Sequence, residues 1–89
     1  MKSVIHDEKR CYFCGSYNGI QEHHIFGGPD RRNAEKYGLK VNLCYLCHDR
    51  VHGKNGKAWM QQLHEIGQRA FEEKYSRDQF RKEFRKSYL

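Results

Sequence analysis

The order of hydrophobic and polar residues predicts two short strands in the first half of the chain. Residues 39–43 (LKVNL) alternate apolar and polar side chains, a pattern typical of a strand with one buried face. Residues 20–26 (IQEHHIF) follow the turn signal Asn18-Gly19 and predict its partner strand. Residues 27–38 lie between the two strands and contain glycines and the only proline, so we expect an irregular loop there.

The second half of the chain predicts helices. Residues 44–53 show helical spacing up to Gly53, which predicts a short helix. Apolar residues then recur at helical intervals from about residue 57 to 75, and the capping-box sequence at 76–79 (SRDQ) predicts another helix over roughly 77–86. We expect the large aromatic side chains of these two helices to be core residues and not base-stacking groups: Trp59, Phe71, Phe80 and Phe84.

The length of the chain, 89 residues, predicts a single small domain over 1–89. Within it we expect a core unit at 11–53, a helical extension at 57–89 and a loose polar lead-in at 1–10. A chain of this size often needs a disulfide or a metal to supplement its core. The formal net charge of +6, from 17 basic and 11 acidic side chains, favours a polyanionic partner such as nucleic acid.

The distribution of apolar residues argues against a membrane segment. No stretch approaches the roughly 20 apolar residues of a membrane helix, and the first ten residues (MKSVIHDEKR) lack the apolar run of a signal peptide. We therefore expect no membrane partner and a cytoplasmic location. In that reducing compartment, the four cysteines are expected to bind metal and not to form disulfides.

The four cysteines form two Cys-x-x-Cys pairs. Cys11 and Cys14 make one pair, Cys44 and Cys47 make the other, and 29 residues lie between them. Each pair can supply two thiolates to a tetrahedral Zn²⁺ at about 2.3 Å per bond. The spacing predicts a structural zinc site, with free buried cysteines or a redox pair as the alternatives. Closing this site would bring residue 14 close to residue 44 and fold the segment between them into a hairpin.

Four histidines belong to the same region. His48 and His52 are four residues apart and share one face of the predicted helix, where both imidazoles can reach one ion. The predicted hairpin returns His23 and His24 to this neighbourhood. One histidine can act as a general base while others hold a divalent cation, and these are the parts needed to hydrolyse a phosphodiester. The alternative is a chance spacing of surface histidines.

This arrangement resembles the HNH, or ββα-metal, endonuclease family, and in particular the small HNH proteins encoded by phages and prophages. The histidines match the family spacing, and the Cys-x-x-Cys pairs stand before the first strand (CYFC) and at the start of the helix (CYLCH), as in zinc-containing members. The resemblance covers residues 11–53. It implies an α+β fold in which a hairpin and a helix hold one catalytic divalent metal, here followed by an α-helical extension.

The resemblance also implies roles for individual residues. His24 matches the general base that activates water. The ligands of the catalytic metal, which would be Mg²⁺, Mn²⁺, Ni²⁺ or Zn²⁺, match His23, His48 and His52. The implied activity is metal-dependent hydrolysis of DNA phosphodiester bonds, in a bacterial host cell or as a phage-encoded protein.

Three features of this region stay open at the level of sequence. Leu39 occupies the place of the family's central Asn. Successive strand residues point to opposite faces, so His23 and His24 can meet one phosphate only through a twist, a bulge or the edge of the hairpin. Glu22 is either a partner that orients an imidazole or a solvated acid. The candidates to replace the family's Asn are Asn42 and Asn33.

Basic side chains that neutralise phosphates are the expected DNA contacts. Arg50 is the first candidate because it shares the predicted helix with His48 and His52. Leu39 favours another hypothesis, a zinc-stabilised DNA-binding module that is inactive or weak in catalysis. A third is an interaction protein whose helical tail docks on a partner protein that supplies specificity. The remaining candidates for DNA contact are Arg31, Arg32, Lys54 and Lys57, with a further basic cluster at Arg81, Lys82, Arg85 and Lys86.

Overall fold

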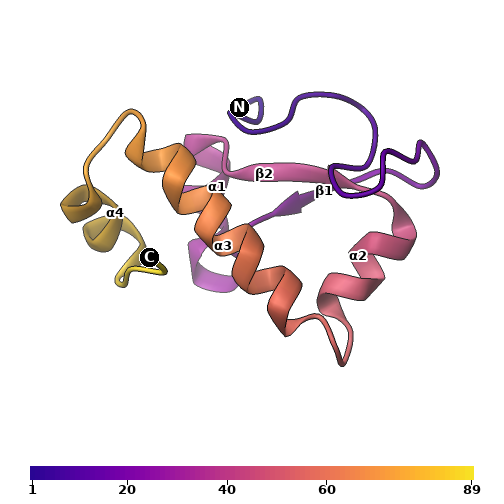
Figure 1. The fold of residues 1–89 in the computed structure, drawn as a ribbon. Coiled ribbons are helices and arrows are strands. Elements are labelled where there is room, and N and C mark those ends of the chain that lie inside the picture. Colours follow the sequence, from indigo (N-terminus) through magenta and orange to yellow (C-terminus); the bar gives the residue numbers. More distant parts are fainter.

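A two-stranded antiparallel hairpin lies at the centre of the molecule, and helices pack along it (Figure 1). The computed structural model describes all residues from Met1 to Leu89. The strands are β1 (Gln21–His24) and β2 (Lys40–Leu43). A short 3-10 helix and four α-helices complete the fold: η1 (Gly28–Asp30), α1 (Arg31–Tyr37), α2 (Tyr45–His52), α3 (Lys57–Glu72) and α4 (Arg77–Phe84). The predicted α+β class, hairpin and C-terminal helices are confirmed.

The register of the hairpin decides where its two histidines point. His23 lies opposite Val41 on β2, and His24 lies opposite Lys40. Because successive residues of a strand face opposite sides, His23 and Val41 share the face that is buried in the core, with His23 only 4 % exposed. His24 and Lys40 share the other face, where both contact Glu35 of α1.

Residues 27–38 are not an irregular loop, and that prediction was wrong. The segment forms η1 and then α1, because its helix breakers stand at the ends of these helices and not inside them. Pro29 lies in the first turn of η1, where a missing amide hydrogen costs no helical hydrogen bond. Gly38 ends α1 in the left-handed conformation at φ 68°. Between them, Arg31–Tyr37 (RRNAEKY) contains neither glycine nor proline.

The C-terminal helices begin where the sequence predicted and end slightly earlier. α3 starts at Lys57 and ends at Glu72 instead of near residue 75. α4 starts after Ser76, whose hydroxyl accepts a hydrogen bond from the amide of Gln79, as expected of a capping residue. None of the helices combines the length and the apolar character needed to cross a membrane.

Phe26, directly after β1, joins the hairpin to the C-terminal helices. Its ring centroid lies 5.5 Å from that of Phe80, 4.8 Å from that of Phe84 and 5.2 Å from that of His64. Phe71, Phe80 and Phe84 are buried as predicted, whereas Trp59 is only half-buried. The same buried cluster also contains three of the four cysteines, so one core supports the cysteine site and the helical extension.

Residues 1–10 have no regular secondary structure, as predicted, but they contact the hairpin and α1. The amide of Val4 donates to the carbonyl of Gly38 at 3.0 Å. The side-chain amide of Asn42 donates to the carbonyl of Glu8 at 2.6 Å. In Figure 1 this indigo segment runs beside β2. The lead-in therefore covers the exposed edge of the sheet, which would otherwise present unpaired backbone groups.

Candidate zinc site and candidate active site

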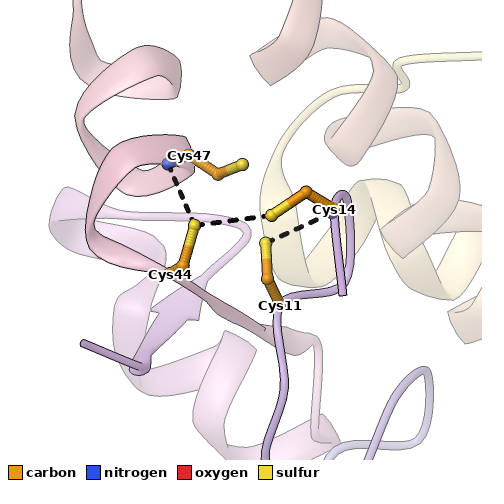
Figure 2. A group of neighbouring side chains, drawn as sticks. All are labelled: Cys11, Cys14, Cys44 and Cys47. Atoms are coloured by element: carbon orange, nitrogen blue, oxygen red, sulfur yellow. Dashed lines mark hydrogen bonds between the residues drawn. The ribbon is translucent and has the colours of Figure 1, made fainter. Parts of the chain in front are cut away.

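The four cysteines come together at one end of the hairpin (Figure 2). Cys11 and Cys14 lie in a turn before β1, and Cys44 and Cys47 lie at the start of α2. All four sulfur atoms lie within 4.8 Å of one another, and no disulfide links them. The Sγ atoms of Cys14 and Cys44 are 3.6 Å apart, so the predicted approach of residue 14 to residue 44 is confirmed. Ligands about 2.3 Å from a tetrahedral Zn²⁺ lie about 3.8 Å from one another, so the set fits such an ion.

Backbone amides point at two of these sulfur atoms. The amide of Cys14 donates to Sγ of Cys11 and the amide of Cys47 donates to Sγ of Cys44, each at 3.5 Å (Figure 2). Burial raises the pKa of the Cys11 thiol, but hydrogen bonds from the backbone of Cys14, Cys44 and Phe13 outweigh burial and lower this pKa to about 6. The lowered pKa favours the thiolate of Cys11, the form that binds zinc, whereas burial raises the pKa of Cys47 in the same cluster.

The first cysteine turn is attached to the hairpin by backbone hydrogen bonds. The amide of Gly15 donates to the carbonyl of Cys11 at 2.9 Å and closes the turn, with Gly15 in the left-handed region at φ 77°. The amide of Tyr12 donates to the carbonyl of Asn42 on β2 at 2.8 Å. The second cysteine pair follows β2 directly and begins α2, where Cys44 is the N-terminal capping residue. A bound zinc ion would thus fix α2 to the end of the hairpin.

Three histidines meet between β1 and α2. The ring nitrogens of His23, His48 and His52 include one atom from each residue that lies within 4.8 Å of the other two. Their ring centroids are 5.5 Å apart for His23 and His48, 5.2 Å for His23 and His52, and 4.7 Å for His48 and His52. The side chains of His48 and His52, four residues apart on α2, therefore meet the side chain of His23 on β1, as the sequence predicted.

His23 is a buried imidazole with an unpartnered ring nitrogen. Its Nε2 atom is buried and has no hydrogen-bond partner in the protein. Burial first, and then the nearby charges of His52 and His48, lower the pKa of His23 to about 4, so that the imidazole is neutral at pH 7. Burial likewise lowers the pKa of His48. A buried nitrogen without a partner is energetically costly, and a cation held by three neutral imidazoles would remove that cost.

His24 has different neighbours. Its Nε2 atom lies 2.8 Å from Oε1 of Glu35, and the side-chain Nε of Arg31 donates to its Nδ1 at 3.4 Å. Glu35 is also bound by the buried Lys40, whose Nζ lies 3.1 Å and 3.2 Å from the two carboxylate oxygens. Lys40 reaches Glu22 on the same strand face at 3.2 Å. Glu22 therefore contacts Lys40 and not an imidazole.

All four histidines of this region line one hollow of about 270 Å³. Its lining includes no hydrophobic side chain. Although His23 and His24 leave β1 on opposite faces, both line this hollow. The complete lining is Glu22, His23, His24, Gly27, Arg31, His48 and His52.

The basic residues expected to contact DNA lie in different places. Arg31 lines the hollow, and Arg32 is exposed beside it on α1. Arg50 is exposed on α2, but its guanidinium carbon lies 5.9 Å from the ring centroid of Trp59 and it does not line the hollow. Lys54 and Lys57 are exposed around the turn between α2 and α3. Of these five residues, the structure brings only Arg31 to the histidines.

A core residue occupies the position at which the resemblance to HNH proteins predicts Asn. Leu39 is 0 % exposed and packs with the buried cluster. Asn42 and Asn33, the two candidates to replace an Asn, bind elsewhere. The side chain of Asn42 donates to the carbonyl of Glu8 at 2.6 Å, and that of Asn33 donates to the carbonyl of Glu83 at 3.0 Å. Neither residue lines the hollow.

Glu35 and Lys40 are the site residues that sequence reasoning missed. Glu35 falls in the segment that was predicted to be a loop, and only α1 carries it over His24. The signal that could have located it is the run RRNAEKY between Pro29 and Gly38, a short helix with its breakers at both ends. Lys40 was predicted in the strand, but its burial depends on the acids that surround it.

Comparison of the chain with protein-family models, with curated proteins and with solved structures gave no match.

Proposed function

We propose that the protein is a metal-dependent DNA endonuclease of the HNH, or ββα-metal, type. The observation that carries this proposal is the convergence of His23, His48 and His52 within 4.8 Å, in a hollow that also contains His24. In metal-assisted phosphodiester hydrolysis, three imidazoles can hold the cation and a further histidine can act as the general base. The order of hairpin and helix agrees with the family resemblance.

The metal site would be held by the strand and the helix together. His23 comes from β1, and His48 and His52 come from consecutive turns of α2. A divalent cation bound there would supply positive charge to the scissile phosphate and to the leaving oxygen. The protein's own contribution is rigidity, because His23 is buried and the four-cysteine site anchors the start of α2.

His24 is the proposed general base. In hydrolysis, the oxygen of a water molecule forms a bond to phosphorus as the bond from phosphorus to the leaving oxygen breaks, and the attacking water loses a proton. A neutral imidazole can take that proton. His24 suits this role because it lines the hollow without belonging to the three-histidine set.

DNA is the proposed substrate, bound mainly through its phosphate backbone. The chain carries a net charge of +6, and Arg31 places a guanidinium beside His24. The hollow offers no hydrophobic side chain on which a base could stack. Contacts to phosphates carry no direct sequence information, so we propose that sequence preference, where the enzyme has one, comes from a partner protein.

A zinc-stabilised DNA-binding module is the second candidate, and the burial of Leu39 favours it. In that case the four cysteines would still hold the fold, and the basic surface would still bind DNA. The three histidines would then have no catalytic role. This candidate predicts salt-sensitive DNA binding without cleavage.

A cleavage assay tests the proposal. Purified zinc-loaded protein is incubated with supercoiled plasmid and Mg²⁺, Mn²⁺ or Ni²⁺, beside an EDTA control and the His24→Ala variant. We expect nicking that requires the added metal and is lost in His24→Ala, while zinc content and the circular dichroism spectrum are unchanged. A His24→Ala protein that cuts at the normal rate would remove His24 from the mechanism. A folded, zinc-loaded wild-type protein that binds DNA but never cuts it would favour the binding module.

A further inference from the structure

The carboxylate of Glu35 contacts the ring of the proposed base, with Oε1 at 2.8 Å from Nε2 of His24. We propose that Glu35 is a positioning residue that fixes the orientation and tautomer of His24, so that Nδ1 is the atom that accepts the proton. This role of Glu35 rests on the endonuclease function proposed above, in which His24 is the general base.

Two independent contacts define the same tautomer. A carboxylate can only accept hydrogen bonds, so Nε2 of His24 must carry the proton that Glu35 receives. Arg31 can only donate, and its Nε points to Nδ1 of the same ring at 3.4 Å. A neutral ring with its proton on Nε2 and a lone pair on Nδ1 that accepts from Arg31 satisfies both neighbours. To act as the base, Nδ1 must exchange this 3.4 Å contact with Arg31 for the attacking water. The opposite tautomer would face Glu35 with a lone pair and Arg31 with a hydrogen.

Glu35 is itself held in the anionic state. Lys40 donates to both of its carboxylate oxygens, and the Lys40 side chain is only 7 % exposed. Hydrogen bonds from the amino group of Met1, from His24 and from Lys40, in that order, lower the pKa of Glu35 to about 2. Glu35 therefore remains a carboxylate, an acceptor for His24, throughout the neutral range.

The backbone of α1 brings Glu35 to this position. The amide of Gly38 donates to the carbonyl of Glu35 at 3.2 Å, and the amide of Leu39 donates to the carbonyl of Ala34 at 2.8 Å. These bonds end α1 and turn the chain directly into β2, where Lys40 lies opposite His24. Glu35 and Lys40 are thus fixed on the strand face that carries His24, and Leu39 is the buried residue that anchors the turn.

A purely structural ion pair is the competing explanation for these contacts. The side chain of Glu35 is 41 % exposed, so water screens its charge, and the buried Lys40 keeps Glu22 as a second acid at 3.2 Å when Glu35 is replaced. Replacement of Glu35 should therefore leave the fold intact. A positioning role predicts in addition a change in the His24 ring itself, which loss of an ion pair alone would not cause.

Nuclear magnetic resonance can read the tautomer directly. In zinc-loaded, ¹⁵N-labelled protein, the two ring nitrogens of His24 are assigned near pH 8 in the wild type and in Glu35→Ala, Glu35→Gln and Glu72→Gln. We expect a protonated Nε2 and an unprotonated Nδ1 in the wild type, and a mixture of both tautomers in Glu35→Ala. The Gln amide oxygen can still accept from Nε2, so Glu35→Gln should keep the wild-type tautomer. Glu72→Gln removes a paired carboxylate on α3 and is the matched control.

Cleavage kinetics give the functional comparison. Glu35→Ala should lower kcat by about 10- to 100-fold, the usual effect of losing a partner that orients a functional imidazole. The KM for DNA should change little, because Glu35 is an acid and does not bind phosphate. Glu35→Gln should fall between the wild type and Glu35→Ala.

The outcomes separate this proposal from the function on which it rests. An active wild-type enzyme whose Glu35→Ala variant keeps both the His24 tautomer and kcat would overturn the role of Glu35 alone. A wild-type protein that cleaves no DNA with any metal would overturn the endonuclease function and the catalytic part of this inference. In that case the nitrogen resonances would still decide whether Glu35 sets the tautomer.

Discussion

His23 and His24 are neighbours on β1, yet the ring centroid of His23 lies 5.2 Å from that of His52, while Nε2 of His24 lies 2.8 Å from Glu35. The alternation of the strand produces this separation, since consecutive side chains leave on opposite faces. His23 thereby packs against the imidazoles of α2, and His24 contacts the carboxylate of Glu35 on α1. Both histidines nevertheless line one hollow.

This separation predicts different metal contents for two alanine variants. His23→Ala should lose the site for a second divalent ion but keep the structural zinc, because the four cysteines are untouched. His24→Ala should keep both metals, since His24 contacts Glu35 and Arg31 instead of the three-histidine set. Metal analysis of the zinc-loaded proteins, followed by calorimetric titration with Mn²⁺ or Ni²⁺, measures both sites. Equal Ni²⁺ affinity in wild type and His23→Ala would contradict this assignment.

Removal of one cysteine should unfold much of the molecule. Cys44 is 2 % exposed, belongs to the buried cluster and caps α2. Structural zinc sites contribute roughly 10 kcal/mol or more to folding, which exceeds the stability of most small domains. Cys44→Ser should therefore lose zinc and helical signal, as measured by metal analysis and circular dichroism. His52→Ala, which changes an exposed residue of the same helix, is the control and should keep both.

Gly56 fixes the distance between α2 and α3. A methyl group at this position would overlap the carbonyl oxygens of Arg50 and Val51 at the end of α2. These are backbone atoms, so the two helices would have to move apart. Gly56→Ala should lower the free energy of unfolding by about 1–3 kcal/mol, as measured by urea denaturation of the zinc-loaded protein. Gly27 has open space around it, and Gly27→Ala should change that free energy by less than about 0.5 kcal/mol.

The features that the sequence predicted well are those set by short-range spacing. Two matched Cys-x-x-Cys pairs and a histidine pair four residues apart have little freedom once the hairpin closes, and the structure brings each set within 4.8 Å. The predicted starts of α3 at Lys57 and of α4 at Arg77 also agree with the structure. Gly56 directly precedes α3, and Ser76 is the capping residue of α4. Local patterns of this kind carry most of their structural meaning within a few residues.

The features that were missed depend on tertiary contacts. Helix α1 was not predicted because its segment contains glycine and proline. Composition alone does not tell whether such residues lie inside a helix or at its ends. The partnership of Glu35 with His24 joins residues eleven positions apart through that unpredicted helix. Arg50 shares α2 with two histidines, but its side chain packs near Trp59 of α3, a contact that no local pattern indicates.

His64 predicts a dependence of stability on pH. Its ring centroid lies 5.2 Å from that of Phe26 and 4.5 Å from that of Tyr88. Burial is the main cause that lowers the pKa of His64. A hydrogen bond with the backbone of Ile25 raises this pKa, and the charge of Lys86 lowers it further. Below the ordinary pKa of 6.5, the unfolded chain therefore binds a proton at His64 more readily than the folded protein does. Stability contributed by His64 is complete above that pH and is lost as pH falls below it.

Urea denaturation between pH 8 and pH 5 tests this dependence. His64→Gln cannot titrate, so its free energy of unfolding should fall less steeply on acidification than that of the wild type. Proton-driven loss of zinc affects both proteins alike and cancels in the difference between their slopes. Parallel curves for the two proteins would show that His64 has the same pKa in the folded and unfolded states.

Arg31 and Arg50 should differ in their effect on DNA. Arg31 lines the hollow and donates to His24, whereas Arg50 lies on α2 with its guanidinium near Trp59. Arg31→Gln should therefore weaken DNA binding, reduce the slope of log K against log salt by about one, as expected for one lost phosphate contact, and slow cleavage. Arg50→Gln should cause a smaller decrease in both binding and cleavage. Fluorescence anisotropy with a labelled duplex at several salt concentrations, together with plasmid nicking, measures these effects. Equal losses in the two variants would mean that phosphate binding extends evenly over α1 and α2 and is not centred on the histidine hollow.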